Sequence, residues 1–238
     1  MLLRADLSAQ EAEQIPSGIL AKNSSKFSGS VTAPPGILAK NSSKFRIASY
    51  SEVAVADAYV ALLTPKRAFY AVDGKAGLTR TDSEGRFDFG DFALPPGREV
   101  LVEVFGPTGD SLIDYAVSAE GSNVSQVSLA TTLVTRFAIE QANAKGKSLA
   151  AFDRRRLVDL AGGTRGALER GDLRVDGAVF DFGKRKALLR AYQAVIKGDL
   201  LASWRAFLGF DPVDIPPDAA NPAEATQGQT AGAVGSAL

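Results

Sequence analysis

The sequence predicts an α+β protein, in which an antiparallel β-sandwich of the transthyretin-like or immunoglobulin-like kind precedes a helical C-terminal segment and a flexible tail. Short alternating apolar segments separated by turns fill residues 28–130, which is typical of a sandwich. The apolar spacing becomes helical in residues 131–211. Residues 212–238 are rich in Pro, Ala, Gly and Gln and predict a low-complexity tail, and residues 1–27 predict an N-terminal arm.

Alternation is clearest in two segments of the expected sandwich. Arg86–Phe89 places two Phe on one face and two charged residues on the other, and Val100–Phe105 repeats the pattern with three Val. Pro65 and Asp73-Gly74 are expected to end strands. The other expected strands are Ser28–Thr32, Val53–Leu63, Phe69–Val72, Leu78–Thr81, Leu112–Val117 and Val124–Leu129.

Helices are expected from Thr131 onward. Thr131 or Thr132 is expected to cap the first helix, and Gly146 to end it. A second helix is expected to start at Ser148 or Asp153. These assignments place a helical layer directly after the last expected strand.

The strongest helical pattern runs from Lys184 to Leu208. Its apolar stripe includes Tyr192, Trp204 and Phe207, for which core packing is the expected role. Gly162-Gly163 is expected to end the preceding helix, Gly198-Asp199 to divide this one, and Gly209 to end it. Residues 174–182 fit either a strand or a loop.

Four segments resemble the carboxypeptidase regulatory-like domains, a family with a transthyretin-like β-sandwich. They are Ser28–Val31, Val55–Leu62, Thr81–Phe89 and Leu94–Gly97, of which Thr81–Phe89 is the most specific. The resemblance implies a module of the kind carried by secreted and envelope proteins of bacteria, as a stalk or accessory domain. It brings no catalytic residues, and the stretch between Val31 and Val55 departs from the family pattern.

The composition excludes several kinds of chemistry. The chain has no Cys and no His, so it can form neither a Ser-His-Asp triad, nor a thiolate nucleophile, nor a Cys- or His-based metal site. Lys+Arg and Asp+Glu balance at 27 each, which removes the simplest argument for a nucleic-acid partner. These absences do not exclude a carboxylate pair, a Lys nucleophile or a hard-metal site. We expect no enzyme activity and no catalytic, cofactor-binding or metal-binding residues; the rival hypothesis is an enzyme with Asp82 and Asp88 in general acid–base roles.

The charged and glycine-rich motifs fit ordinary structural roles better than sites. Asp82, Glu84, Asp88 and Asp91 surround one turn, and turn chemistry is favoured over a calcium site. Basic clusters at residues 154–156 and 184–186 are expected to be solvated helix faces, although either could meet an acidic partner. Three matches to the glycosylation pattern begin at Asn23, Asn41 and Asn123.

A ten-residue segment occurs twice without change, as Gly18–Phe27 and Gly36–Phe45. A duplicated surface loop is the simplest interpretation. Alternatively, one copy pairs within its own sandwich and the other adds a strand to a neighbouring molecule. The residues that would make such contacts are Ile19, Leu20, Phe27, Ile37, Leu38 and Phe45.

These observations predict a non-catalytic structural or interaction protein of the bacterial cell envelope or extracellular space. Its expected partners are proteins, including copies of itself. The alternatives are a subunit of a self-assembling fibre or pilus built by strand exchange, and an accessory domain of a secreted enzyme. No stretch is apolar enough to span a membrane, and Met1–Asp6 lacks the apolar core of a secretory signal. The sequence thus leaves a cytoplasmic location as the alternative.

Overall fold

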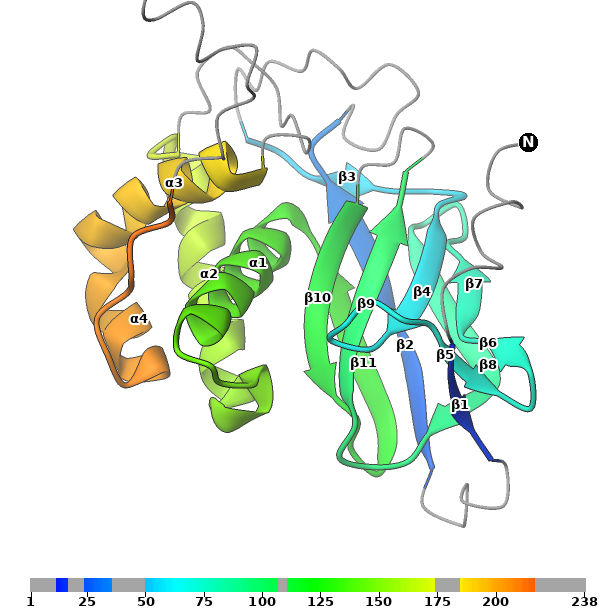
Figure 1. Cartoon of the computed structure of the whole chain (residues 1–238). Coiled ribbons are helices and arrows are strands. Elements are labelled where there is room, and N and C mark those ends of the chain that lie inside the picture. The colour runs from blue at the N-terminus through cyan, green and yellow to red at the C-terminus, as the bar shows by residue number, and fades with distance from the viewer. Residues whose placement is uncertain (1–11, 17–23, 36–49, 107–110, 174–184, 217–238) are drawn as a thin grey trace, which may run out of the picture.

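The computed structural model describes residues 12–16, 24–35, 50–106, 111–173 and 185–216 (Figure 1). It confirms the α+β class, because strands dominate up to residue 127 and helices follow. The helices gather on one side of the strands, next to β10 (Figure 1). Buried residues of both parts form one continuous hydrophobic core.

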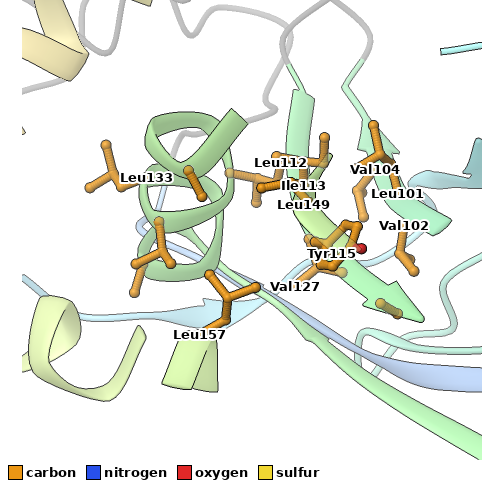
Figure 2. Packing of buried hydrophobic residues seen from close by; sticks show 14 of the residues in the cluster. Leu101, Val102, Val104, Leu112, Ile113, Tyr115, Val127, Leu133, Leu149 and Leu157 are labelled. Atoms are coloured by element: carbon orange, nitrogen blue, oxygen red, sulfur yellow. The ribbon is translucent and has the colours of Figure 1, made fainter. Parts of the chain in front are cut away.

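The first sheet contains four antiparallel strands in the order β10-β9-β4-β7. Its strands are β10 (Ser111–Val117), β9 (Glu99–Phe105), β4 (Tyr59–Leu63) and β7 (Leu78–Arg80). Side chains of β9 are buried on both faces of the sheet, including Leu101, Val102 and Val104. Figure 2 shows Leu112 of β10 between helix α1 and Val104 of β9.

The second sheet is mixed, which corrects the expectation of a purely antiparallel arrangement. It contains β8 (Arg86–Leu94), β2 (Ser25–Ala33), β11 (Gly121–Val127) and the short β3 (Val53–Ala54). β2 is antiparallel to β8 but parallel to β11. Alternation of apolar residues sets which face is buried, but it carries no information on strand direction.

A third, small sheet includes residues that the sequence assigned to an arm. β1 (Glu13–Ile15) pairs in parallel with β5 (Tyr70–Val72), which forms a hairpin with β6 (Lys75–Ala76). The predicted turn Asp73-Gly74 lies in that hairpin, and both residues have positive φ. The expected single strand from Val53 to Leu63 is wrong, because Asp57, at a φ of 54°, separates β3 from β4.

Helix α1 (Leu129–Ala144) begins with a capping box rather than with the expected Thr cap. Ser128 is the cap: its hydroxyl accepts from Thr131 N–H, and Thr131 Oγ1 accepts from Ser128 N–H. Thr132 does not cap the helix but binds the sheet: its Oγ1 accepts a hydrogen bond from the N–H of Ile113 in β10 at 2.9 Å. Gly146 lies just after the helix with positive φ, as the sequence predicts.

Helix α2 (Arg154–Arg170) starts at the predicted cap Asp153, but it does not end at Gly162-Gly163. It ends at Gly171, which has the left-handed conformation. A Cβ added at Gly163 would lie 3.0 Å from Leu200 Cδ2, so this glycine allows close packing against the next helical segment. At Gly162 an added Cβ would meet no atom within 4 Å.

The last helical segment consists of α3 (Arg185–Val195), a π-helical turn (Ile196–Leu200) and α4 (Leu201–Leu208). The π turn lies where the sequence predicted a division, although Asp199 does not cap α4. Gly209 ends α4, as expected. Tyr192 and Trp204 are fully buried and pack edge-to-face on Phe137 of α1, which confirms their predicted core role.

The first residues of the expected tail are held against the helices. Ile215 is buried, and its N–H donates to Gln193 Oε1 at 2.9 Å. Gln141 Nε2 donates to the carbonyl of Val213 at 2.8 Å. Residues 217–238, like 174–184, lie outside the described residues. Within the described chain, no helix is long and apolar enough to cross a membrane.

The two adjacent glycines of α2 give a matched test of this packing. We expect Gly162→Ala to raise the free energy of unfolding by about 1 kcal/mol, because alanine favours a helix interior and space is open there. Gly163→Ala should raise the free energy of unfolding much less, because its methyl group would crowd Leu200. Urea unfolding measures both. An equal gain from the two substitutions would contradict the close contact at Gly163.

Candidate functional site

One candidate site is a cavity of about 470 Å³ at the seam between the two main sheets and the helices. We call it the seam cavity. It lies where β10 leaves the first sheet, β11 enters the second, and α1 and α2 cover both. Its lining residues are Asp114, Tyr115, Val124, Gln126, Ser128, Ala130, Thr131, Val134, Thr135, Arg154, Leu157, Val158, Ala161, Gly162 and Arg165. Its volume is typical of sites that hold small molecules.

Asp114 contributes the one carboxylate of the seam cavity. It lies on β10, and its Oδ1 accepts from the N–H of Tyr115 at 2.9 Å. Burial raises the pKa of Asp114 from 3.8 to about 6, although the charge of Arg154, the Tyr115 N–H and the Ser125 hydroxyl each favour the ionised form. Asp114 is thus a half-buried carboxylate that titrates just below neutral pH.

Arg154 contributes a positive charge that acts on Asp114 without forming an ion pair with it. It is the first residue of α2, directly after the cap Asp153, and its side chain is half-buried. Among the described residues it makes no ion pair, and its one opposite-charge partner within electrostatic range is Asp114. The other arginine of the cavity, Arg165, is bound to Glu52 at 3.3 Å.

The rest of the wall is mainly apolar, with side chains from β11, α1 and α2. Val134 and Leu157 are buried, whereas Val124 and Val158 are exposed at the margin. Gly162 leaves one side of α2 without a side chain, which widens the cavity. The seam cavity therefore combines opposite charges that are not paired with each other and an apolar wall, which suits binding of a small amphipathic molecule.

The sequence contains one signal for this site, in strand β10. Asp114 is the one charged residue in the mainly apolar strand Ser111–Val117, and a carboxylate in such a strand is a candidate for a perturbed pKa and hence for a site. Arg154 was expected to be solvated. Arg156, two residues later, donates to the carbonyl of Ala206 at 2.8 Å, so the basic cluster is partly built into the helical layer.

A second candidate is the outer face of the β8-β2-β11 sheet, which we call the open face. One side of these strands is buried while the other is partly or fully exposed. Strand pairing aligns its side chains in rows. They are Lys26 and Ser122, then Asp88, Ser28 and Val124, then Arg86, Ser30 and Gln126. Val124 is 64% exposed and lies at the border shared with the seam cavity.

The acidic cluster is divided between turn and surface. Asp82 Oδ1 accepts from the N–H groups of Glu84 and Arg86 at 2.9 and 2.8 Å, which confirms the predicted turn chemistry. These bonds lower the pKa of Asp82. Asp88 points outward on the open face. In the described part of the chain, no group of three acidic residues could hold a metal ion.

Asn123, one of the three glycosylation matches, is not available as an acceptor in this fold. It is buried on β11, its Oδ1 accepts from Ala119 N–H at 3.0 Å, and its Nδ2 donates to the carbonyl of Ala119 at 3.1 Å. Asn23 and Asn41 lie outside the described residues. So does Lys184 of the second basic cluster.

Only Phe27 of the six predicted contact residues is described. It is 1% exposed on β2, so the end of the first copy belongs to its own sheet. The other five, Ile19, Leu20, Ile37, Leu38 and Phe45, lie outside the described residues. If the second copy, Gly36–Phe45, took the place of the first copy in β2, Ile47, which follows the second copy, would occupy the position of Gly29. A Cβ at that position would lie 2.0 Å from the carbonyl oxygen of Ser125, so the second copy does not fit β2 in this register.

Two other acidic residues, the half-buried Glu99 and the buried Glu103, make structural contacts, although Glu103 Oε2 has no hydrogen-bond partner. Glu99 Oε1 accepts from the hydroxyls of Tyr115 and Ser148, both at 2.8 Å, and joins the helical layer to β9. Glu103 is 1% exposed and pairs with Arg67 at 3.2 Å. Neither carboxylate faces the seam cavity.

Comparison of the chain with protein-family models, with curated proteins and with solved structures found no match. The resemblance to carboxypeptidase regulatory-like domains therefore stays a prediction.

The contact at Gly29 predicts a large loss of stability on substitution. Gly29→Ala should lower the free energy of unfolding by about 2 kcal/mol or more, because the new methyl group would meet backbone and the Phe87 ring rather than a movable side-chain end. Chemical denaturation measures the loss. Gly162→Ala serves as the matched control, and a neutral result at Gly29 would refute the close approach of β2 and β11.

The raised pKa of Asp114 predicts a specific pH dependence of stability. The folded protein retains this proton up to about pH 6, whereas the unfolded chain loses it near pH 3.8. The contribution of Asp114 to the free energy of unfolding is therefore greatest below about pH 4 and declines as the pH rises through 6. Asp114→Asn keeps an acceptor for Tyr115 N–H and removes the titration.

The melting temperature of the Asn variant should exceed that of the wild type at about pH 7.5 and match it near pH 4. Asp88→Asn, a change on the open face, is the control that should leave this difference unaltered. A wild-type advantage at neutral pH would show that the ionised Asp114 is stabilising.

Proposed function

We propose that this chain is a non-catalytic interaction module of the bacterial cell envelope or extracellular space, built on a transthyretin-like β-sandwich. The observation that carries the proposal is the open face. Strands β9 and β10 are covered on both sides, whereas β8, β2 and β11 leave one ordered side uncovered. An exposed sheet surface backed by a buried core is suited to contact with a protein partner.

The chemistry of the open face fits such a partner. An exposed apolar side chain, Val124, lies among Ser28, Gln126 and charged residues. The charges are largely neutralised within the chain, since Arg86 pairs with Glu84 and Lys26 with Asp91, at 2.6 and 3.8 Å. Protein interfaces commonly place apolar contacts at the centre and polar groups at the rim. A nearly neutral face favours a protein over nucleic acid.

The location and the sandwich type rest on the sequence resemblance. Among the alternatives, assembly through exchange of the second copy into β2 is disfavoured by Gly29. Accessory function in a secreted enzyme remains compatible with the open face, since such a module would also act through contact.

The test uses a photo-crosslinking residue at position 124 in the full chain, produced in the cells that naturally make it. We expect a discrete cross-linked protein species, and its loss when Ser28→Arg blocks the open face. The same probe at Val53, which is 49% exposed on β3, is the matched control and should give no such species. Fractionation of the same cells should place the chain outside the cytoplasm. Equal cross-linking from both positions, or none, would refute the open face as the contact surface.

A further inference from the structure

The seam cavity holds opposite charges that form no ion pair with each other. Arg154 and Asp114 both line it, and no ion pair joins them, although a protein can readily close such a pair when nothing else needs the charges. Two half-buried opposite charges that line one mainly apolar cavity without an ion pair between them are complementary to a molecule that carries both signs.

We infer that the seam cavity binds a small zwitterion with an apolar body, such as an α-amino acid with a branched aliphatic side chain. The carboxylate of the ligand would pair with Arg154, and its ammonium group with Asp114. This binding site goes beyond the proposed protein contact and does not depend on it.

Arg154 suits the carboxylate. A guanidinium presents parallel N–H donors that match the two oxygens of a carboxylate. The residue also begins α2, where the unpaired N–H groups of the helix add a favourable field for an anion. Arg165 is less suited to bind the ligand carboxylate, because its guanidinium already forms an ion pair with Glu52.

Asp114 suits the ammonium group. Its Oδ1 is held by the Tyr115 N–H, which fixes the orientation of the carboxylate. A cationic ligand group would replace the solvation that burial removes from this carboxylate. A purely anionic ligand would meet Asp114 with like charge, and a purely cationic ligand would meet Arg154 and Arg165 in the same way.

The apolar wall suits an aliphatic body. Leu157 and Val134 are buried, Ala161 is partly buried, and Val158 stands at the margin. No aromatic ring other than Tyr115 lines the described cavity, so stacking of a planar ligand has little support. Gly162 keeps open the space that the side chain of the ligand would occupy.

The test compares L-leucine with its two one-charge analogues, 4-methylpentanoate and 3-methylbutylamine, by saturation-transfer NMR and calorimetry on the full chain at neutral pH. We expect saturable binding of leucine, with each analogue at least about tenfold weaker, since each lacks one charge contact. Arg154→Gln and Asp114→Asn should each weaken leucine binding by about tenfold or more.

Two further variants locate the ligand. Gly162→Phe should abolish binding by filling the cavity, with retained folding checked by circular dichroism. Arg155→Gln is the matched control: Arg155 is the exposed neighbour of Arg154 and does not line the cavity, so the affinity should not change. If Gly162→Phe fails to fold, the two charge variants still decide the question.

Several results would overturn the inference. Equal binding of 4-methylpentanoate would make this a simple anion site, and equal binding of 3-methylbutylamine a cation site. No saturation with leucine up to about 10 mM, or an equal loss in Arg155→Gln, would refute the zwitterion site. None of these results bears on cross-linking at position 124, so the two proposals fail separately.

Discussion

The free edge of β10 is the feature on which the rest of the architecture depends. An unpaired strand edge presents backbone N–H and C=O groups that must be satisfied when they are buried. Here α1 covers the edge and supplies hydroxyls: Thr132 accepts from the Ile113 N–H at 2.9 Å, and Thr131 donates to the Ile113 carbonyl at 3.3 Å. The next edge amide, that of Tyr115, is satisfied by Asp114. The start of α1 is thereby fixed to the sheet, and the other helices pack around it.

The seam cavity follows from this arrangement. Because β10 and β11 belong to different sheets, the chain between them crosses a seam that neither sheet closes. Helix α1 closes part of it, and α2, which packs on α1, covers the remainder without a large side chain at Gly162. Asp114 and Arg154 reach the same cavity from elements about forty residues apart, which explains how a charged pair can persist without direct contact.

Two close contacts in the fold depend on glycine, at Gly29 in β2 and at Gly163 in α2. Gly29 lets β2 lie close to β11 and Phe87, and so excludes the residue that would follow the duplicated segment. Gly163 lets α2 pack on Leu200 at the π turn. In both places glycine acts through its lack of a Cβ. Gly29 allows close packing within the second sheet, and Gly163 allows close packing within the helical layer.

The sequence by itself determined the α+β class, most strand positions, the caps at Asp153 and Gly209, and the core role of Tyr192 and Trp204. These follow from local periodicity and local hydrogen bonding, which neighbouring residues fix. Only the tertiary structure decided that β11 runs parallel to β2, that α2 continues through Gly162-Gly163, and that Asp114 and Arg154 line the same cavity. Those features depend on contacts between segments far apart in the chain, which override local preference and leave no periodic trace in the sequence.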